Sequence, residues 1–266
     1  MQMPSVFSNH HTATFDWRDR LRAAAIHLGL SAFVAFLAAL LVFALWYPYP
    51  YREISGGRDL FLLVVCVDVV LGPLVTFAIF DRAKPRRELR RDLALVGLLQ
   101  LAGLAYGLWT VNLARPVHMV FEYDRFRVVH LVDVPLELED RSPPGIQVAP
   151  WAGPTLLSLR PFGSEQEKFD ATMVALQGLP LAARPDFWQS YQAGRDQVLQ
   201  AAKPVSQLKS RFPQRAAEID AILGRAGREA TGAAYLPLIA RKAEGWTVLL
   251  DGTSAEVVGY LPLDSF

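Results

Sequence analysis

The sequence contains little cysteine and little charge. Cys66 is the single cysteine among 266 residues, which excludes an internal disulfide and a cysteine cage for a metal within this sequence. Charged residues make up only 20%, and the formal net charge is +1. This balance gives no overall attraction for nucleic acid, so we expect no nucleic-acid partner. Hydrophobic residues make up 52% and crowd into the first 115 positions.

Known catalytic signatures are also missing. The sequence has no His-Glu-x-x-His pair, no Gly-x-Ser-x-Gly elbow, no P-loop and no Gly-x-Gly-x-x-Gly turn. His118 and His130 fall on two expected strands, but neither cysteine nor a matched carboxylate spacing supports a metal there. We therefore expect a protein that is not an enzyme, with no cofactor and no metal site, and interpret both histidines as sheet residues.

Three long apolar segments lie near the N-terminus, at residues 23–46, 60–80 and 93–114. A bilayer core about 30 Å thick needs roughly 20 apolar residues at about 1.5 Å per residue. None of the segments carries a charged helical face. The pattern predicts three transmembrane helices that form a domain over residues 23–114. A signal peptide cleaved after Ala44 is the competing interpretation of the first segment, but that segment is about twice the usual length.

Basic residues predict the orientation of these helices. The loop at residues 81–92 carries six basic residues against three acidic ones, and three arginines precede the first segment. Cytoplasmic loops carry such an excess. We therefore expect residues 1–22 and the loop at 81–92 in the cytoplasm, and residues 115–266 outside. Aromatic residues where the first segment leaves the membrane resemble an interfacial belt: Trp46, Tyr47, Tyr49 and Tyr51.

Polar side chains interrupt the apolar segments, among them Asn112 in the third segment. Asp68 is expensive in lipid, so it must face the helix bundle, a partner or water. Tyr106 lies at about the same depth, and a hydrogen bond between the two is the structural interpretation; partner binding and transport remain the alternatives. His27 lies roughly 6 Å into the membrane from the cytoplasmic side. Gln100 lies in the third segment.

Glycine and proline mark two further features inside the membrane. Gly72 and Pro73 free backbone groups and predict a kink in the second helix. Gly103 and Gly107 form a small-xxx-small pair that lets another helix approach closely. The pair does not say whether that helix belongs to this chain or to another protein.

The remainder, residues 115–266, has the pattern of a water-exposed α+β domain. Alternating apolar residues predict strands at 117–123, 126–132, 236–242, 246–251 and 255–261. Residues 142–154 read as loop, and helices are expected at 165–177, 185–202 and 213–223. We expect the strands to pair antiparallel.

An ordered set of short motifs extends from about Arg20 to the C-terminus. These are Ala25-Ile-His-Leu28, Trp46-Tyr-Pro48, Val67-Asp-Val-Val-Leu-Gly-Pro-Leu74, Arg91-Asp-Leu93, Gln100-Leu-Ala102, Ala105-Tyr-Gly107, Ala114-Arg-Pro-Val117, Asp124-Arg-Phe126, Gly153-Pro154, Leu236-Pro-Leu238 and Thr247-Val-Leu-Leu-Asp251. In this set of motifs the chain resembles the TfpX/TfpZ-type type IV pilin accessory proteins of bacterial inner membranes.

The resemblance implies a multi-pass inner-membrane chaperone with a periplasmic domain, which binds a type IV pilin subunit and assists pilus assembly. In that family's partner, a glutamate at the fifth mature residue lies roughly 6 Å into the membrane, at the depth of His27. His27, Gly103 and Gly107 are then the expected pilin-binding residues. Asp68 is expected to support the bundle, together with the polar and kink-forming residues Gly72, Pro73, Gln100 and Tyr106.

Two other functions remain open on the sequence. A membrane-anchored sensor with a periplasmic ligand-binding domain would use the basic loop at 81–92 to contact a cytoplasmic partner. A transporter or membrane enzyme built around Asp68 would need a pathway that three helices with one acid do not supply. Recovery of a pilin with the protein separates the accessory role from both.

Overall fold

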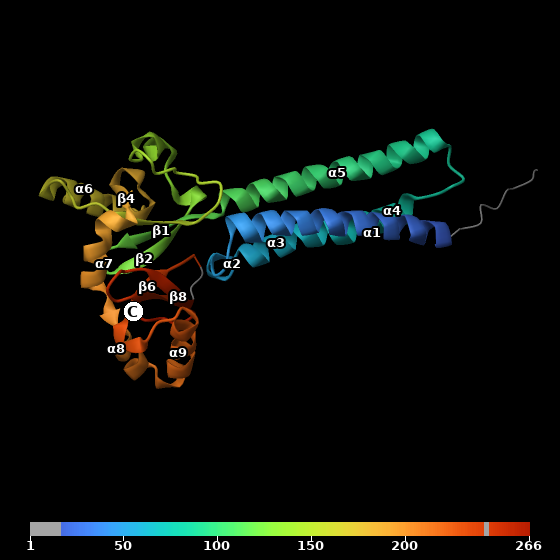
Figure 1. The fold of residues 1–266 in the computed structure, drawn as a ribbon. Helices are drawn as coiled ribbons and strands as arrows, with labels where there is room; N and C mark the ends of the chain where they lie inside the picture. The colour runs from blue at the N-terminus through green and yellow to red at the C-terminus, as the bar shows by residue number, and fades with distance from the viewer. Residues whose placement is uncertain (1–16, 242–244) are drawn as a thin grey trace, which may run out of the picture. The chain divides into compact units, whose positions relative to one another are not determined.

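The computed structural model describes residues 17–241 and 245–266. Its contacts divide the chain into two compact units. The first contains the chain up to Leu37 together with Leu63–Gly107, and the second contains Ala38–Leu62 together with Leu108–Phe266. The first unit is helical and the second carries the β-sheet (Figure 1). Residues 1–16 of the expected cytoplasmic segment, and the end of the strand expected at 236–242, lie outside the described residues.

Within the described residues, three helices are long and apolar enough to cross a membrane, as predicted. They are Trp17–Trp46, Gly57–Ile79 and Arg86–Leu113. Two of them contain a π-helical turn. The elements in order are α1 (Trp17–Leu40), a π-turn (Leu41–Trp46), α3 (Gly57–Cys66), a π-turn (Val67–Leu71), α4 (Gly72–Ile79) and α5 (Arg86–Leu113). α1 and α5 begin before their apolar runs, because arginine is itself a good helix former.

Charged side chains hold the polar ends of the first unit together. Arg20 donates from Nη1 to the carbonyl oxygen of Ala78, 2.8 Å away at the C-terminal end of α4. A cation at this end complements the helix dipole. The Arg82 Nε lies 2.9 Å from Oδ2 of Asp19. The basic residues that predict orientation therefore also join the start of α1 to the end of α4.

The first membrane helix ends at Trp46, where the sequence predicts its end. Pro48 and Pro50 follow, and neither can donate a backbone hydrogen bond. Of the aromatic residues expected at the membrane surface, Tyr49 is 63% exposed. Tyr47 is fully buried, and its hydroxyl donates to the carbonyl oxygen of Val111 over 3.1 Å.

The short helix α2 (Tyr51–Ile54) belongs to the core of the second unit. Tyr51 and Ile54 are buried in the same hydrophobic cluster as strand residues of the sheet. The hydroxyl oxygens of Tyr51 and Tyr260 lie 2.9 Å apart, and the Tyr51 hydroxyl also donates to the sulfur of Met119 over 3.4 Å. The segment between the first two membrane helices is thus part of the sheet's own packing.

One mixed sheet organises the second unit, and the predicted α+β class is confirmed. Along its main path the strands follow the order β4-β3-β1-β2-β6-β7-β8, and β5 pairs with β6. The strands are β1 (Pro116–Glu122), β2 (Arg125–His130), β3 (Thr155–Leu159), β4 (Trp188–Ser190), β5 (Lys203–Pro204), β6 (Ala233–Ile239), β7 (Trp246–Asp251) and β8 (Val257–Leu261). Most neighbours are antiparallel, as expected, but β1 with β3 and β2 with β6 are parallel.

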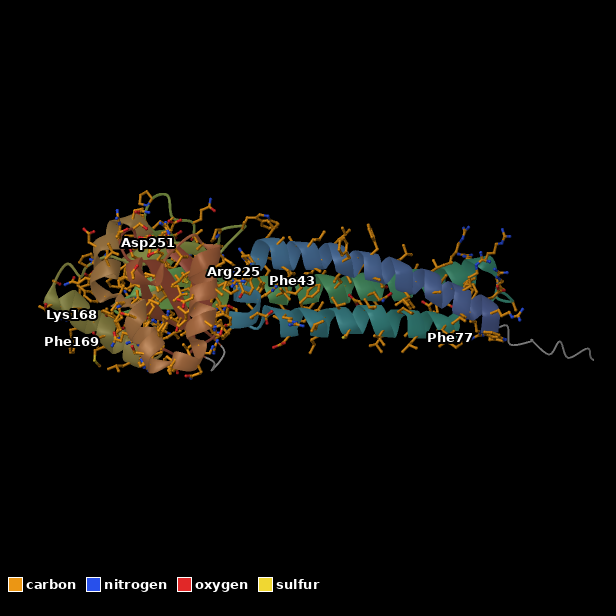
Figure 2. The ribbon with its side chains drawn as sticks, turned by 60° about the horizontal axis from the view of Figure 1, so that its bottom comes forward. Phe43, Phe77, Lys168, Phe169, Arg225 and Asp251 are labelled. Carbon is orange, nitrogen blue, oxygen red and sulfur yellow. The ribbon has the colours of Figure 1, made fainter. Side chains whose placement is uncertain are left out.

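The later helices of this unit are α6 (Glu165–Leu176), α7 (Arg195–Ala201), α8 (Val205–Arg211) and α9 (Ala216–Arg225). The Ser164 side chain accepts from the Glu167 N–H and starts α6, as its capping pattern predicts. α6 turns much of its surface to solvent, and Lys168 and Phe169 project from it (Figure 2).

The single helix expected at 185–202 is wrong in its first half. Residues 188–190 form β4, and Trp188 pairs with Leu159 of β3. The Trp188 ring is 1% exposed and donates from Nε1 to the Ala182 carbonyl oxygen over 2.8 Å. Burial of this indole and its pairing outweigh local helix propensity, which is a weak preference. β3 and α8 have no counterpart in the prediction.

His118 is a buried sheet residue, as expected. It is 0% exposed, with Nδ1 2.6 Å from the Thr155 hydroxyl and Nε2 3.2 Å from the Val148 carbonyl oxygen. Burial lowers the pKa of His118 from 6.5 to about 4. Between about pH 4 and about pH 6.5, the folded protein therefore keeps the His118 imidazole neutral, whereas in the unfolded chain this imidazole is mostly protonated.

We predict that the second unit loses stability as the pH falls from about 6.5 to about 4. In this window the unfolded state binds the extra proton, so stability rises with pH; the full effect is roughly 3 kcal/mol. The measurement is the thermal midpoint of the full chain in nanodiscs at about pH 7 and about pH 4.5. His118→Gln should show a smaller shift, and an equal shift in both proteins would contradict the assignment.

Candidate functional site

A cavity of about 260 Å³ opens in the helical unit. It is smaller than the roughly 300–1,000 Å³ typical of small-molecule pockets. Two predicted site residues, His27 and Asp68, line it together with a third, Gln100. The full lining is His27, Leu30, Ser31, Val34, Ala35, Val65, Asp68, Gly97, Gln100, Leu101 and Leu104.

His27 connects α1 to α4 and also faces this cavity. Its Nδ1 lies 2.5 Å from the hydroxyl oxygen of Thr76, which is 2% exposed. Thr76 thus occupies one ring nitrogen and leaves Nε2 for another partner. When the threonine donates, Nε2 carries the proton and is itself a donor. A carboxylate is the natural acceptor for such a group.

The π-turn Val67–Leu71 explains four of the predicted polar and kink-forming residues. In its register a carbonyl oxygen accepts from the N–H five residues later. For the carbonyl of Asp68 that position is Pro73, which has no N–H. Gln100 supplies the missing donor, with its Nε2 2.9 Å from the Asp68 carbonyl oxygen. A Cβ added at Gly72 would overlap the Gln100 amide, so Gly72 provides the space that this bond needs.

The side chain of Asp68 is not used in this connection. The sequence predicts a hydrogen bond between the Asp68 side chain and Tyr106 in the third helix. In the structure the third helix is joined to Asp68 by Gln100, which donates to the backbone carbonyl of Asp68. Tyr106 is 68% exposed. The Asp68 carboxylate lies beside Gly103, where an added Cβ would be 3.8 Å from Oδ1.

Gly103 and Gly107 let α5 approach the second membrane helix of the same chain. Gly107 is buried, and a Cβ added there would overlap the side chain of Val64 in α3. The close approach predicted from this pair is therefore made within the helical unit. Whether the two glycines also contact a pilin remains a prediction.

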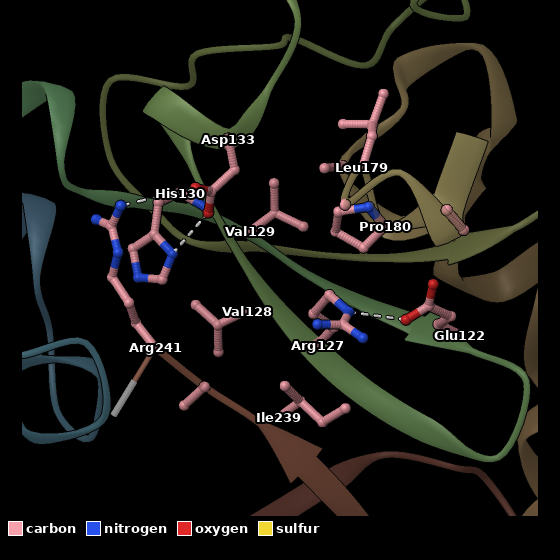
Figure 3. A pocket seen from close by; sticks show the side chains of 14 residues that line it. Glu122, Arg127, Val128, Val129, His130, Asp133, Leu179, Pro180, Ile239 and Arg241 are labelled. Carbon is pink, nitrogen blue, oxygen red and sulfur yellow. Dashed lines mark hydrogen bonds and ion pairs between the residues drawn. The ribbon is translucent and has the colours of Figure 1, made fainter. Parts of the chain in front are cut away.

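The second unit holds its own cavity, of about 550 Å³, between β2 and the segment after α6. Ion pairs border it at both ends (Figure 3). Arg127 Nε donates to Glu122 over 2.8 Å. His130 Nδ1 lies 3.1 Å from Asp133, whose other carboxylate oxygen is 3.8 Å from Arg241. Because Arg127 and Arg241 each lie against a carboxylate, the charges of these side chains largely cancel around the cavity.

Known proteins were compared with the whole chain. A family model described as fimbrial assembly protein FimB matches residues 15–56. The fimbrial assembly protein of serogroup I from Dichelobacter nodosus is 34% identical over 247 residues, which is 92% of this chain and 95% of that protein. The chain belongs to the fimbrial assembly protein family. The serogroup E1 protein of the same organism is 32% identical over 246 residues, again 92% of this chain and 95% of the relative.

Another fimbrial assembly protein of Dichelobacter nodosus, from serogroups C1 and C2, is 40% identical over 116 residues, or 44% of this chain and 88% of its own length. No solved structure matches. Membership in the family confirms the resemblance to type IV pilus accessory proteins.

Sequence reasoning missed three residues of the helical site in this fimbrial assembly protein. Thr76 binds His27, while Ser31 and Gly97 line the cavity. Ser31 lies one helical turn after His27, so helical periodicity contained a signal for it. For Thr76 and Gly97 the signal was absent, because the pairing of α1, α4 and α5 decides which faces meet.

We predict that Gly72→Ala destabilises the helical unit by about 1–3 kcal/mol, because its methyl group displaces the Gln100 amide and leaves the Asp68 carbonyl without a donor. The measurement is the thermal midpoint in detergent. Gly97→Ala is the matched control: nothing lies within 4 Å of its added Cβ, so a change between zero and a gain of about 1 kcal/mol is expected. Equal losses in both variants would reject the arrangement.

Proposed function

We propose that this fimbrial assembly protein is a non-enzymatic membrane accessory protein that binds a type IV pilin subunit and stabilises it before pilus assembly. The family supports the assembly role. The observation that carries the binding role is the helical cavity, whose mostly apolar lining includes an available histidine nitrogen and three small residues. Such a surface fits an apolar helix that carries an acidic side chain.

Three small residues in the lining of the cavity favour close packing of a helix against it. Ser31, Ala35 and Gly97 line it, and nothing lies within 4 Å of a Cβ added at Gly97. Small residues let two helix backbones approach within a membrane, where packing and hydrogen bonds drive association. His27 supplies the polar contact at one end. We propose that its Nε2 meets the pilin glutamate that the family resemblance implies.

The proposed topology places the N-terminus in the cytoplasm and the sheet-bearing unit in the periplasm, with the three helices in the bacterial inner membrane. The excess of basic residues at 81–92 and before the first helix supports this orientation.

Orientation is tested with single cysteines in a Cys66→Ser background. Ala83→Cys lies between the second and third membrane helices, and Ala217→Cys lies on an exposed position of α9. A membrane-impermeant maleimide added to spheroplasts should label the second variant at once and the first only after lysis. The reverse pattern would overturn the topology.

Pilin binding is tested by co-purification in nanodiscs with the pilin, or with the same pilin carrying an unrelated transmembrane helix. We predict recovery that depends on the native helix and is lost in Gly97→Leu, whose side chain fills the cavity. Gly29→Leu is the control, because an added Cβ there also meets nothing within 4 Å but Gly29 does not line the cavity. Recovery that ignores the helix exchange would move recognition to the second unit.

The role of His27 is separated from its bond to Thr76 by two variants in the same assay. His27→Ala should lower pilin recovery by about 5- to 30-fold, as expected for the loss of one polar contact in a membrane. Thr76→Val removes the intramolecular bond but keeps the imidazole, and should retain most of the recovery. If both variants lose recovery equally, His27 acts only through the packing of α1 on α4.

A sensor is the second candidate, and the cavity of the second unit is the observation that favours it. Its volume of about 550 Å³ suits a small ligand. Absence of any pilin recovery, with both proteins folded, would reject the accessory role and favour this candidate.

A further inference from the structure

Among the residues that the structure describes, no hydrogen bond or ion pair is seen at the Asp68 carboxylate. The hydrogen bond that Gln100 donates to this residue goes to its backbone carbonyl. The side chain is half-buried, lines the cavity, and has Gly103, which offers no side chain, beside it. An ionisable group inside a membrane is costly unless it is paired, so its partner must come from whatever fills the cavity.

The connection between helices does not require this side chain. Gln100 binds the Asp68 carbonyl, which any residue at this position would present. A purely structural residue here could therefore be apolar, at lower cost in lipid. The carboxyl group at this position therefore points to a role toward an occupant rather than within the bundle.

Helix geometry gives the distance between Asp68 and the other polar contact. Thr76, which binds His27, lies eight positions after Asp68 in the same membrane helix, a rise of roughly 12 Å. On α1, His27 and Ala35 are also eight positions apart, and both line the cavity. The cavity therefore has one polar group near each end, about two helical turns apart.

We propose that Asp68 is a second contact for the bound pilin helix, about two turns beyond the one that His27 makes. This inference rests on the proposed function and specifies which side chains the partner helix should carry. The helix that fits carries an acidic residue opposite His27. About seven or eight positions further along it carries a hydroxyl-bearing residue, whose O–H can donate to the Asp68 carboxylate.

The test compares Asp68→Leu and Asp68→Asn in the nanodisc co-purification. Asp68→Leu should keep the thermal midpoint of the protein, because Gln100 still binds the backbone, and should lower pilin recovery by about 5- to 30-fold. Asp68→Asn keeps hydrogen-bonding capacity and should restore most of the recovery. A fall in thermal midpoint of the size expected for Gly72→Ala, with recovery of the remaining folded protein unchanged, would overturn the inference.

The partner's side provides the second arm. Replacing the pilin residue seven or eight positions beyond the acidic one with leucine should lower recovery by wild type, yet add little to the loss in Asp68→Leu. The same replacement two positions away, on another helix face, is the control. If pilin binding is lost in Gly97→Leu but unchanged in Asp68→Leu, the proposed function is supported and this inference is rejected. Absence of binding by wild type would reject both.

Discussion

The missing N–H of Pro73 is the constraint on which the helical unit depends. In a membrane no water is available to satisfy a stranded carbonyl, so the protein itself must supply a donor. The π-turn at Val67–Leu71 places that demand at Asp68, and Gln100 meets it from the third helix. Gly72 is required for the amide to reach its acceptor. A single backbone defect thereby fixes how two membrane helices face each other.

The same arrangement separates two roles that share one residue. The backbone of Asp68 belongs to the bundle, whereas its carboxylate is turned toward the cavity. His27 shows a parallel division, since one ring nitrogen binds Thr76 while the residue also lines the cavity. Both polar residues therefore combine a contact that holds the unit with a position on the cavity surface.

The helices and the antiparallel hairpins were predictable because their signals are local. Long apolar runs, Pro48 with Pro50 and the Ser164 cap are read within a few residues. The parallel pairs were not predictable, because the two strands of each pair are far apart in the sequence. These pairs are β1 with β3 and β2 with β6. In the site, the polar residues themselves were visible. The choice of Gln100 over Tyr106 depends on a π-turn, and periodicity alone does not reveal one.

The buried position of α2 has a consequence for how the protein is made. The core of the second unit is built from two stretches of chain that are separated by the second and third membrane helices. Tyr51 and Ile54 are synthesised before the second and third membrane helices, whereas the strands that enclose them are synthesised after both. The core of the second unit can therefore be completed only once both of these helices have been made. A fragment that begins at residue 115 would carry a hole where these two side chains belong.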